Sequence, residues 1–325
     1  MDNERKDEIR LVVWNSILKE VMKSICSDTE KILYHYTSPD GLLGIIQNKQ
    51  VWFGNILDMN DITEIDYSFD NVIIPKIEDS KTISAFSRKK LLDLIPKVRN
   101  HNLYFEQDGR AVAHEANIYV LSTSLNSNSH NLWNMYSKTS SRAGYAISMS
   151  VADLYTALYN GLRHSPKDKN RVASTLLWGR IIYNKTEQES IIEKFLSPLE
   201  EKIDGRDDDF KEILYENVAQ GLYILSAFMK DEDFSQEQEI RFLSIVANEA
   251  FGVGSDKTPY IKFLNINGSI VSKLVMPFDI SKIKKVVVSP YMLEQSHVEN
   301  DLKFFLNKHG VNEFEIVINE KRKLR

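Results

Sequence analysis

The sequence contains one cysteine, Cys26, among 325 residues. A single thiol forms no disulfide within the chain and cannot supply the thiolates of a structural zinc site, so both are excluded. The seven histidines are not spaced as metal ligands, since even His297 and His309 on one expected helix lie twelve residues apart. No HExxH, GxSxG, GxGxxG or GxxxxGK[ST] motif occurs. We therefore expect no metal site, and carboxylate, imidazole and hydroxyl groups are left to carry any reaction.

Glycine, proline and long apolar runs are also scarce. Thirteen Gly and eight Pro residues exclude collagen-like, glycine-linker and proline-rich chains. The charged start MDNERKDEIR lacks the apolar region of a signal peptide, and no run approaches the roughly 20 apolar residues of a membrane helix. We expect a soluble, cytoplasmic protein with no membrane partner. The net charge of −5 disfavours a broadly basic nucleic-acid binder, although a local groove formed by Lys282, Lys284, Lys285 and the basic tail stays open as an alternative.

Apolar and aromatic residues are abundant. They make up 42% of the chain and include 15 Phe, 14 Tyr and 4 Trp, which is enough for a large core. Runs rich in β-branched and aromatic residues alternate with helical patterns from Ile32–Thr37 to Phe314–Ile318. This order predicts an α+β fold with a mixed or antiparallel central sheet of about nine strands. No repeat or low-complexity linker interrupts the sequence, and its length allows one large domain or two medium ones.

Three helical segments are expected between or before the strands. Residues 6–25 carry apolar residues at intervals of four, which is typical of an amphipathic helix that docks on the domain: Ile9, Val13, Ile17 and Val21. Residues 85–105 are expected to form a helix broken at Pro96. Residues 185–230 have a helical pattern and are interpreted as a helical insertion.

Two further helices are marked by their ends. Ser38-Pro39 and Ser289-Pro290 each combine an N-cap residue with a proline at the first helical position. Both pairs therefore predict a helix start. Gly310 is the expected C-cap of the second of these helices.

Four polar patches are candidates for a functional site, because polar groups on buried elements are costly unless they are paired or functional. They are Tyr34-His35-Tyr36-Thr37, Asn60-Asp61-x-x-Glu64, Ser122-x-Ser124 with Trp133-x-x-Tyr136, and Glu237-x-Glu239-x-Arg241. Strand alternation places His35 and Thr37 on one face, and Tyr34 and Tyr36 on the other. The same alternation places the three charges of the last patch on one face of a strand expected over 237–246.

Each patch also has a structural interpretation. His35 can be a hydrogen-bonded strand residue, and Asn60-Asp61-x-x-Glu64 can be a capping box. Trp133 and Tyr136 can form a packed helix face. The charges of the last patch can lie on the solvated face of an edge strand. The functional interpretation requires the four patches to converge on one cleft.

The order of these motifs resembles the bacterial family called domain of unknown function 2971. The resemblance rests on LYHYTSPDGLLGIIQNKQVWFGNILDMNDITE, LSTSLNSNSHNLWNMYSKTSSRAGYAISM, MKDEDFSQEQEIRFLSI, SPYML and FEIVINEKRKLR, in that order from residue 32 to the C-terminus. It implies a functional role for Asn60, Asp61, Glu64, Trp133, Tyr136, Glu239 and Arg241. Because its motifs span residues 32–319, it also implies that residues 1–325 form a single α+β domain. Asn319 stands where the family usually has serine, and the helical segment 184–230 is mostly unspecific to the family.

The layout is also similar to ADP-ribosyltransferases of the His-Tyr-Glu type. This resemblance implies NAD as substrate, with Glu239, Glu237 and His35 as catalytic residues and with Thr37 and Tyr36, beside His35 on the first strand, as NAD-binding residues. It implies Tyr136 or Tyr145 as the middle tyrosine. A carboxylate near the ribose would stabilise the oxocarbenium-like state formed when the nicotinamide–ribose bond breaks. Trp133 or Tyr136 would stack on nicotinamide, and Asn60 and Asp61 would contact the nucleotide. Arg241 would bind the pyrophosphate of NAD, or it would form an ion pair that clamps one of the two glutamates in place.

Two functions are therefore expected as alternatives. One is an NAD-consuming ADP-ribosyltransferase-like enzyme or NAD glycohydrolase, such as a bacterial toxin or phage-defence effector, with a protein or nucleic-acid target and a partner protein or antitoxin. The other is a binding module that senses a nucleotide or phage component without turnover. The enzyme hypothesis predicts that the side chains of His35, Tyr136 and Glu239 meet in one pocket.

Overall fold

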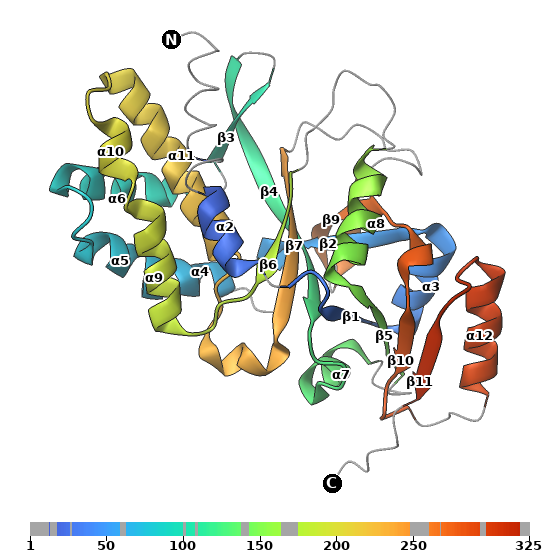
Figure 1. Cartoon of the computed structure of the whole chain (residues 1–325). Coiled ribbons are helices and arrows are strands. Elements are labelled where there is room, and N and C mark those ends of the chain that lie inside the picture. Colours follow the sequence, from blue (N-terminus) through green and yellow to red (C-terminus); the bar gives the residue numbers. More distant parts are fainter. Residues whose placement is uncertain are drawn as a thin grey trace.

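Figure 1 shows a computed structural model of the chain. The structure describes residues 13, 18–26, 28–58, 63–99, 102–107, 110–137, 143–163, 175–247, 260–266, 268–292 and 297–318. Most of the helix expected over residues 6–25 lies outside these ranges. Its described part, α2 (Lys19–Ile25), buries Val21 and Ile25 against the core.

Among the residues that the structure describes, eleven strands form one mixed sheet at the centre of the molecule. Its main path runs β11-β10-β5-β1-β4-β2-β9-β8, while β3 and β7 also pair with β4, and β6 pairs with β7. Only β10 and β11 pair in parallel within the described chain, and the other pairs are antiparallel. The strands are β1 (Ile32–Thr37), β2 (Gln50–Asn55), β3 (Asn102–Gln107), β4 (Arg110–Ser124), β5 (Tyr145–Ser150), β6 (Thr175–Arg180), β7 (Glu239–Ala247), β8 (Tyr260–Ile266), β9 (Ser269–Pro277), β10 (Lys285–Val288) and β11 (Glu315–Ile318). The expected α+β class and mixed sheet are confirmed, with more strands than the nine expected.

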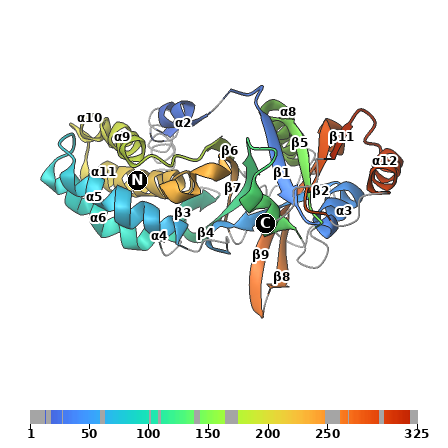
Figure 2. The same cartoon turned by 90° about the horizontal axis from the view of Figure 1, so that it is seen from below.

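Helices gather at the two ends of the sheet (Figure 2). One group comprises α4 (Glu64–Ser68), α5 (Ile74–Asp79), α6 (Ala85–Arg99), α9 (Lys185–Leu196), α10 (Leu199–Ile203) and α11 (Asp208–Ser226). The other comprises α3 (Pro39–Asn48), α8 (Val151–Arg163) and α12 (Val298–Lys308). A short helix, α7 (His130–Tyr136), lies beside β1. Among the described residues, no helix combines the length and apolar character needed to cross a membrane.

Alternating residues of β4 and β7 belong to two separate hydrophobic cores, one on each face of the sheet. Ile118, Val120 and Leu243 pack with the first group of helices. Leu121 and Phe242, which point to the opposite face, pack with α3, α8 and α12. The central strands are therefore apolar on both faces, and a run of charges on β7 is an exception that requires buried partners.

The expected helical stretch 185–230 is helical as α9, α10 and α11. It does not form a separate unit, because α11 packs against α6 and α9 packs against α5. The helical lobe is thus built from two segments far apart in the sequence, 64–99 and 185–226.

Two predicted helix boundaries are wrong. The expected helix 85–105 ends at Arg99, and residues 102–107 form β3. Pro96 lies inside α6 without ending it, because a proline near the last turn removes only one backbone hydrogen bond. The helix expected after Ser289-Pro290 begins at Val298 instead.

The helix start at Ser38-Pro39 is confirmed. The Ser38 hydroxyl accepts a hydrogen bond from the backbone N–H of Gly41, and Pro39 opens α3. Gly310 follows α12 with φ of 90°, a left-handed conformation that favours glycine. These ends were predictable because each depends on a few neighbouring residues.

Candidate functional site

The site is built on the paired strands β4 and β7. Their register places Ser124 opposite Glu239 and Ser122 opposite Arg241, so these side chains share one face of the sheet. Because β7 lies between β4 and β6, the alternative of a solvated edge strand is wrong. Glu239 is 5% exposed and Arg241 is fully buried.

Arg241 is held by four hydrogen bonds. Its Nε donates to Glu239 Oε1 at 2.6 Å, and Nη2 donates to Glu239 Oε2 at 3.1 Å. Nη2 also donates to Glu64 Oε2 at 2.5 Å, and Nη1 donates to the carbonyl of Ala227 at 2.8 Å. Of the two roles expected for Arg241, the structure supports the clamp on a glutamate, because its donors already have protein partners.

A buried lysine extends this network. Lys230 Nζ lies 2.9 Å from Glu64 Oε1, 2.8 Å from Glu237 Oε2 and 3.7 Å from Glu239 Oε2. The same ammonium lies 4.5 Å from the centre of the Phe234 ring. Glu64, Lys230, Glu237, Glu239 and Arg241 therefore form one connected group, which we call the charge cluster.

Glu237 reaches the cluster from outside the strand. It ends a short 3₁₀ helix, η4 (Glu232–Glu237), and Gln238 follows with φ of 46°. The prediction that Glu237 shares a strand face with Glu239 is therefore wrong, because the left-handed Gln238 breaks the alternation. The backbone carbonyl of Glu237 accepts a hydrogen bond of 2.6 Å from the hydroxyl of Ser124, which fixes this turn against β4.

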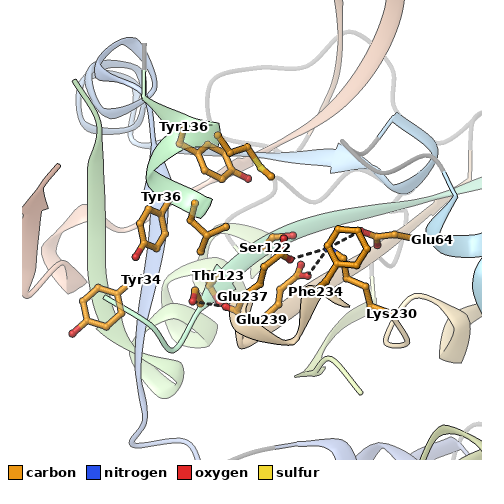
Figure 3. A pocket seen from close by; sticks show the side chains of 13 residues that line it. Tyr34, Tyr36, Glu64, Ser122, Thr123, Tyr136, Lys230, Phe234, Glu237 and Glu239 are labelled. Carbon is orange, nitrogen blue, oxygen red and sulfur yellow. Dashed lines mark hydrogen bonds and ion pairs between the residues drawn. The ribbon is translucent and has the colours of Figure 1, made fainter. Parts of the chain in front are cut away.

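A cavity of about 150 Å³ opens between the charge cluster and a group of aromatic rings (Figure 3). That volume matches a cavity that holds a single benzene-sized ring. Its lining residues are Tyr34, Tyr36, Glu64, Ser122, Thr123, Ser124, Leu132, Met135, Tyr136, Lys230, Phe234, Glu237 and Glu239. Glu64, Lys230 and Phe234 also line an adjoining open hollow of about 530 Å³ with Thr63, Tyr67, Asp231 and Asp233.

Three tyrosines, Tyr34, Tyr36 and Tyr136, form one wall of the cavity, which we call the tyrosine wall. Tyr36 packs edge-on against Trp133 with ring centres 4.6 Å apart, and its centre lies 6.5 Å from that of Tyr136. The Tyr36 hydroxyl donates to the carbonyl of Asn126 at 2.6 Å and accepts from the backbone N–H of Ser129 at 3.1 Å. These bonds fix the Tyr36 ring to the loop that leads into α7, so this ring is positioned before any ligand arrives.

Two of the three carboxylates that line the cavity have opposite pKa shifts. Burial raises the pKa of Glu237 above its ordinary value, an effect that the nearby Lys230 offsets only in part. Burial also acts on Glu239, but the Arg241 guanidinium outweighs it and holds the pKa of Glu239 below its ordinary value. Burial and the neighbouring carboxylates raise the pKa of Tyr136 to about 12, so its hydroxyl stays protonated.

His35 and Thr37 face away from this cavity. The His35 ring lines a small apolar pocket with Leu33, Leu121 and Ile147, and its Nδ1 lies 3.1 Å from the carbonyl oxygen of Ser122. Burial lowers the pKa of His35. Thr37 Oγ1 packs against Gly41 of α3, and a Cβ added at Gly41 would lie only 2.0 Å from this oxygen. The expected meeting of His35, Tyr136 and Glu239 in one pocket does not occur, because strand alternation carries Tyr36, not His35, into the cavity.

The remaining expected site residues divide into three groups. Tyr136 lines the cavity, whereas Tyr145 pairs with Thr37 and packs on the opposite-face core. Trp133 is fully buried behind the tyrosine wall and does not line the cavity, which supports its interpretation as a packed helix face. Asn60 and Asp61 lie outside the described residues. Glu64, the last residue of their motif, belongs to the charge cluster rather than to a helix cap.

Sequence reasoning missed Lys230, Phe234 and Tyr183. Lys230 follows the apolar run 222–229 and precedes an acidic segment, and that isolated cation was the available signal. The Tyr183 hydroxyl accepts a hydrogen bond of 3.0 Å from the backbone N–H of Glu239. Its part in the site depends on the fold, because 56 residues separate it from its partner.

Residues 132–242 match a family model described as "Protein of unknown function (DUF2971)". The match supports the resemblance drawn from the motif order. It includes Tyr136, Lys230, Glu237, Glu239 and Arg241, together with the helical stretch 185–230, most of which was unspecific to the family. The first-strand motif and Glu64 lie outside it. No curated protein matches the sequence.

Proposed function

We propose that the cavity binds the nicotinamide–ribose end of a nucleotide such as NAD and that the protein cleaves its N-glycosidic bond. The observation that carries the proposal is the pair of carboxylates, Glu237 and Glu239, whose surroundings shift their pKa values in opposite directions beside a ring-sized aromatic cavity. Pairs of titratable groups separated in this way are typical of acid–base sites.

Each carboxylate has a distinct role in this reaction. Breaking the bond leaves positive charge on the ribose, and the electron pair of the bond passes to the pyridinium nitrogen. Glu239 stays ionised and stabilises the positive charge. Glu237, whose raised pKa makes it a stronger base than an ordinary carboxylate, takes the proton from the water or acceptor that attacks the ribose.

The aromatic rings orient the leaving group. Tyr36 is held by Trp133 and by its two loop bonds, and its ring centre lies 6.5 Å from that of Tyr136. Both rings line the cavity that would receive a flat ring. Binding a ring between fixed side chains limits the entropy lost in reaching the reactive geometry. Water as acceptor gives an NAD glycohydrolase, and a nucleophile on a protein or nucleic acid gives an ADP-ribosyltransferase-like reaction. His35 has no part in either scheme.

The test measures the fate of the nicotinamide and of the adenylate half of NAD separately. The full chain is incubated with NAD labelled in the nicotinamide or in the adenylate, with and without cell lysate. Free nicotinamide is measured together with label bound to protein or nucleic acid. Wild type should release nicotinamide, while Glu239→Gln and Glu237→Gln should each slow the release by about 10²-fold or more. Glu212→Gln is the matched control, because Glu212 pairs with Lys90 on the helical lobe. Equal release by wild type and Glu239→Gln would remove the proposal.

A binding module without turnover is the second candidate. The observation that favours it is the pairing within the charge cluster, where both oxygens of Glu239 already accept hydrogen bonds from Arg241. Calorimetry with NAD, followed by chromatography of the recovered ligand, separates the two functions. Binding with intact ligand after prolonged incubation supports the sensor, and loss of nicotinamide supports the enzyme.

A further inference from the structure

The charge cluster contains more negative than positive groups. Glu64, Glu237 and Glu239 supply three carboxylates, and Lys230 and Arg241 supply two cations. With all five groups ionised, one negative charge is left without a matching cation. A buried excess charge is unfavourable in a low-dielectric interior, so a cation placed beside it gains free energy.

The excess charge lies on the cavity wall. Both carboxylate oxygens of Glu239 accept hydrogen bonds from Arg241. One oxygen of Glu64 is paired with Arg241 and the other with Lys230. Glu237 bonds Lys230 through Oε2 alone, and its Oε1 has no hydrogen bond or ion pair to any residue that the structure describes. The side chain of Glu237 is 12% exposed, which leaves this oxygen accessible to a ligand.

Aromatic rings surround the same space. Tyr34, Tyr36 and Tyr136 lie to one side of Glu237 and Phe234 lies to the other (Figure 3). A cation is attracted to the face of such rings, and Lys230 over Phe234 is one instance within this wall. The cavity of about 150 Å³ is large enough for one ring and too small for a dinucleotide.

We infer that the cavity selects a positively charged aromatic ring, a pyridinium, over a neutral ring of the same shape. The inference rests on the proposed function in one respect, since it names the charge of the ring that enters the site. It predicts that NAD in its oxidised, cationic form is bound, and that the reduced form with its neutral ring is excluded from the cavity.

A matched pair of small probes tests this selection. 1-Methylnicotinamide is a cation, and 3-methylbenzamide is its neutral isostere, with carbon in place of the ring nitrogen. Calorimetric titration of the full chain should show the cation binding at least about tenfold more tightly than the isostere. Glu237→Gln should reduce this preference to about threefold or less, and the control Glu212→Gln should retain it. Circular dichroism establishes that both variants are folded.

Each outcome decides the inference. Equal affinity of the two probes in wild type, or binding of neither, would overturn it. Retention of the full preference in folded Glu237→Gln would overturn the role of the cavity carboxylate. NAD cleavage measured on the same samples keeps the two proposals apart. Cleavage without a cation preference removes this inference alone, and a cation preference without cleavage removes the proposed enzyme alone.

Discussion

Replacing Arg241 with methionine tests whether the charge cluster stabilises the fold. Arg241 is fully buried, and the substitution removes four hydrogen bonds, to Glu239, Glu64 and the Ala227 carbonyl. Methionine fills much of the same volume, so the main change is electrostatic. Glu239 loses its hydrogen-bond donors, and the only cation left in the cluster is Lys230, 3.7 Å from Glu239.

The expected loss is large. Removing one partner of a buried ion pair costs about 3–5 kcal/mol, because the remaining charge stays buried without compensation. A whole domain is stable by only about 5–15 kcal/mol, so the variant should unfold at a much lower urea concentration. Adding Glu239→Gln to Arg241→Met removes one of the two negative charges that are then left without a matching cation, and should restore on the order of 0.5–3 kcal/mol.

Urea unfolding followed by circular dichroism measures both effects. Lys285→Met is the matched control, since Lys285 pairs with Glu315 at 2.8 Å in an exposed position and should cost less than about 1 kcal/mol. A cost for Arg241→Met no larger than that of this control would show that the charge cluster does not stabilise the fold. A double variant less stable than Arg241→Met alone would show the same.

Three further predictions concern stability. Gly221→Ala places a Cβ 2.4 Å from the Phe195 ring and should lower the free energy of unfolding in urea by about 1–3 kcal/mol. Gly44→Ala has open space around the added Cβ and should stabilise the protein by about 0.5–1 kcal/mol. Equal effects of the two substitutions would contradict the packing at Gly221. Trp133→Ala should cost about 3–5 kcal/mol, and a loss below 1 kcal/mol would show that the ring is not core. Because the pKa of Glu239 is lowered on folding, its ionised form stabilises the protein above about pH 4.5 and this contribution disappears as the pH falls further. The gap in unfolding free energy between wild type and Glu239→Gln should therefore narrow from pH 7 to pH 3, and a constant gap would contradict the shift.

Local features of the fold were predictable from the sequence. The start of α3 depends on Ser38 and Pro39 alone, and most strands were located by their β-branched and aromatic residues. The start of β7 was not. Gln238 adopts a left-handed conformation that ends the strand pattern, and nothing in its side chain demands this.

The candidate site was predicted in part for the same reason. Strand alternation separates His35 from Tyr36, but which face carries the cavity depends on the helices that cover each face. Glu239 and Arg241 were identifiable as charges within an apolar strand. Lys230 was not, because its partner Glu64 lies 166 residues earlier in the chain and the pairing exists only after the helical lobe assembles.

A crystal structure of Glu237→Gln with NAD would show directly whether the cavity holds the nicotinamide ring. The substitution should slow cleavage enough to retain intact ligand. We expect the nicotinamide ring in the cavity between Tyr36, Tyr136 and Phe234, with its ribose beside Glu239. Nicotinamide bound elsewhere, or an empty cavity under conditions where wild type releases nicotinamide, would contradict the assignment of this site.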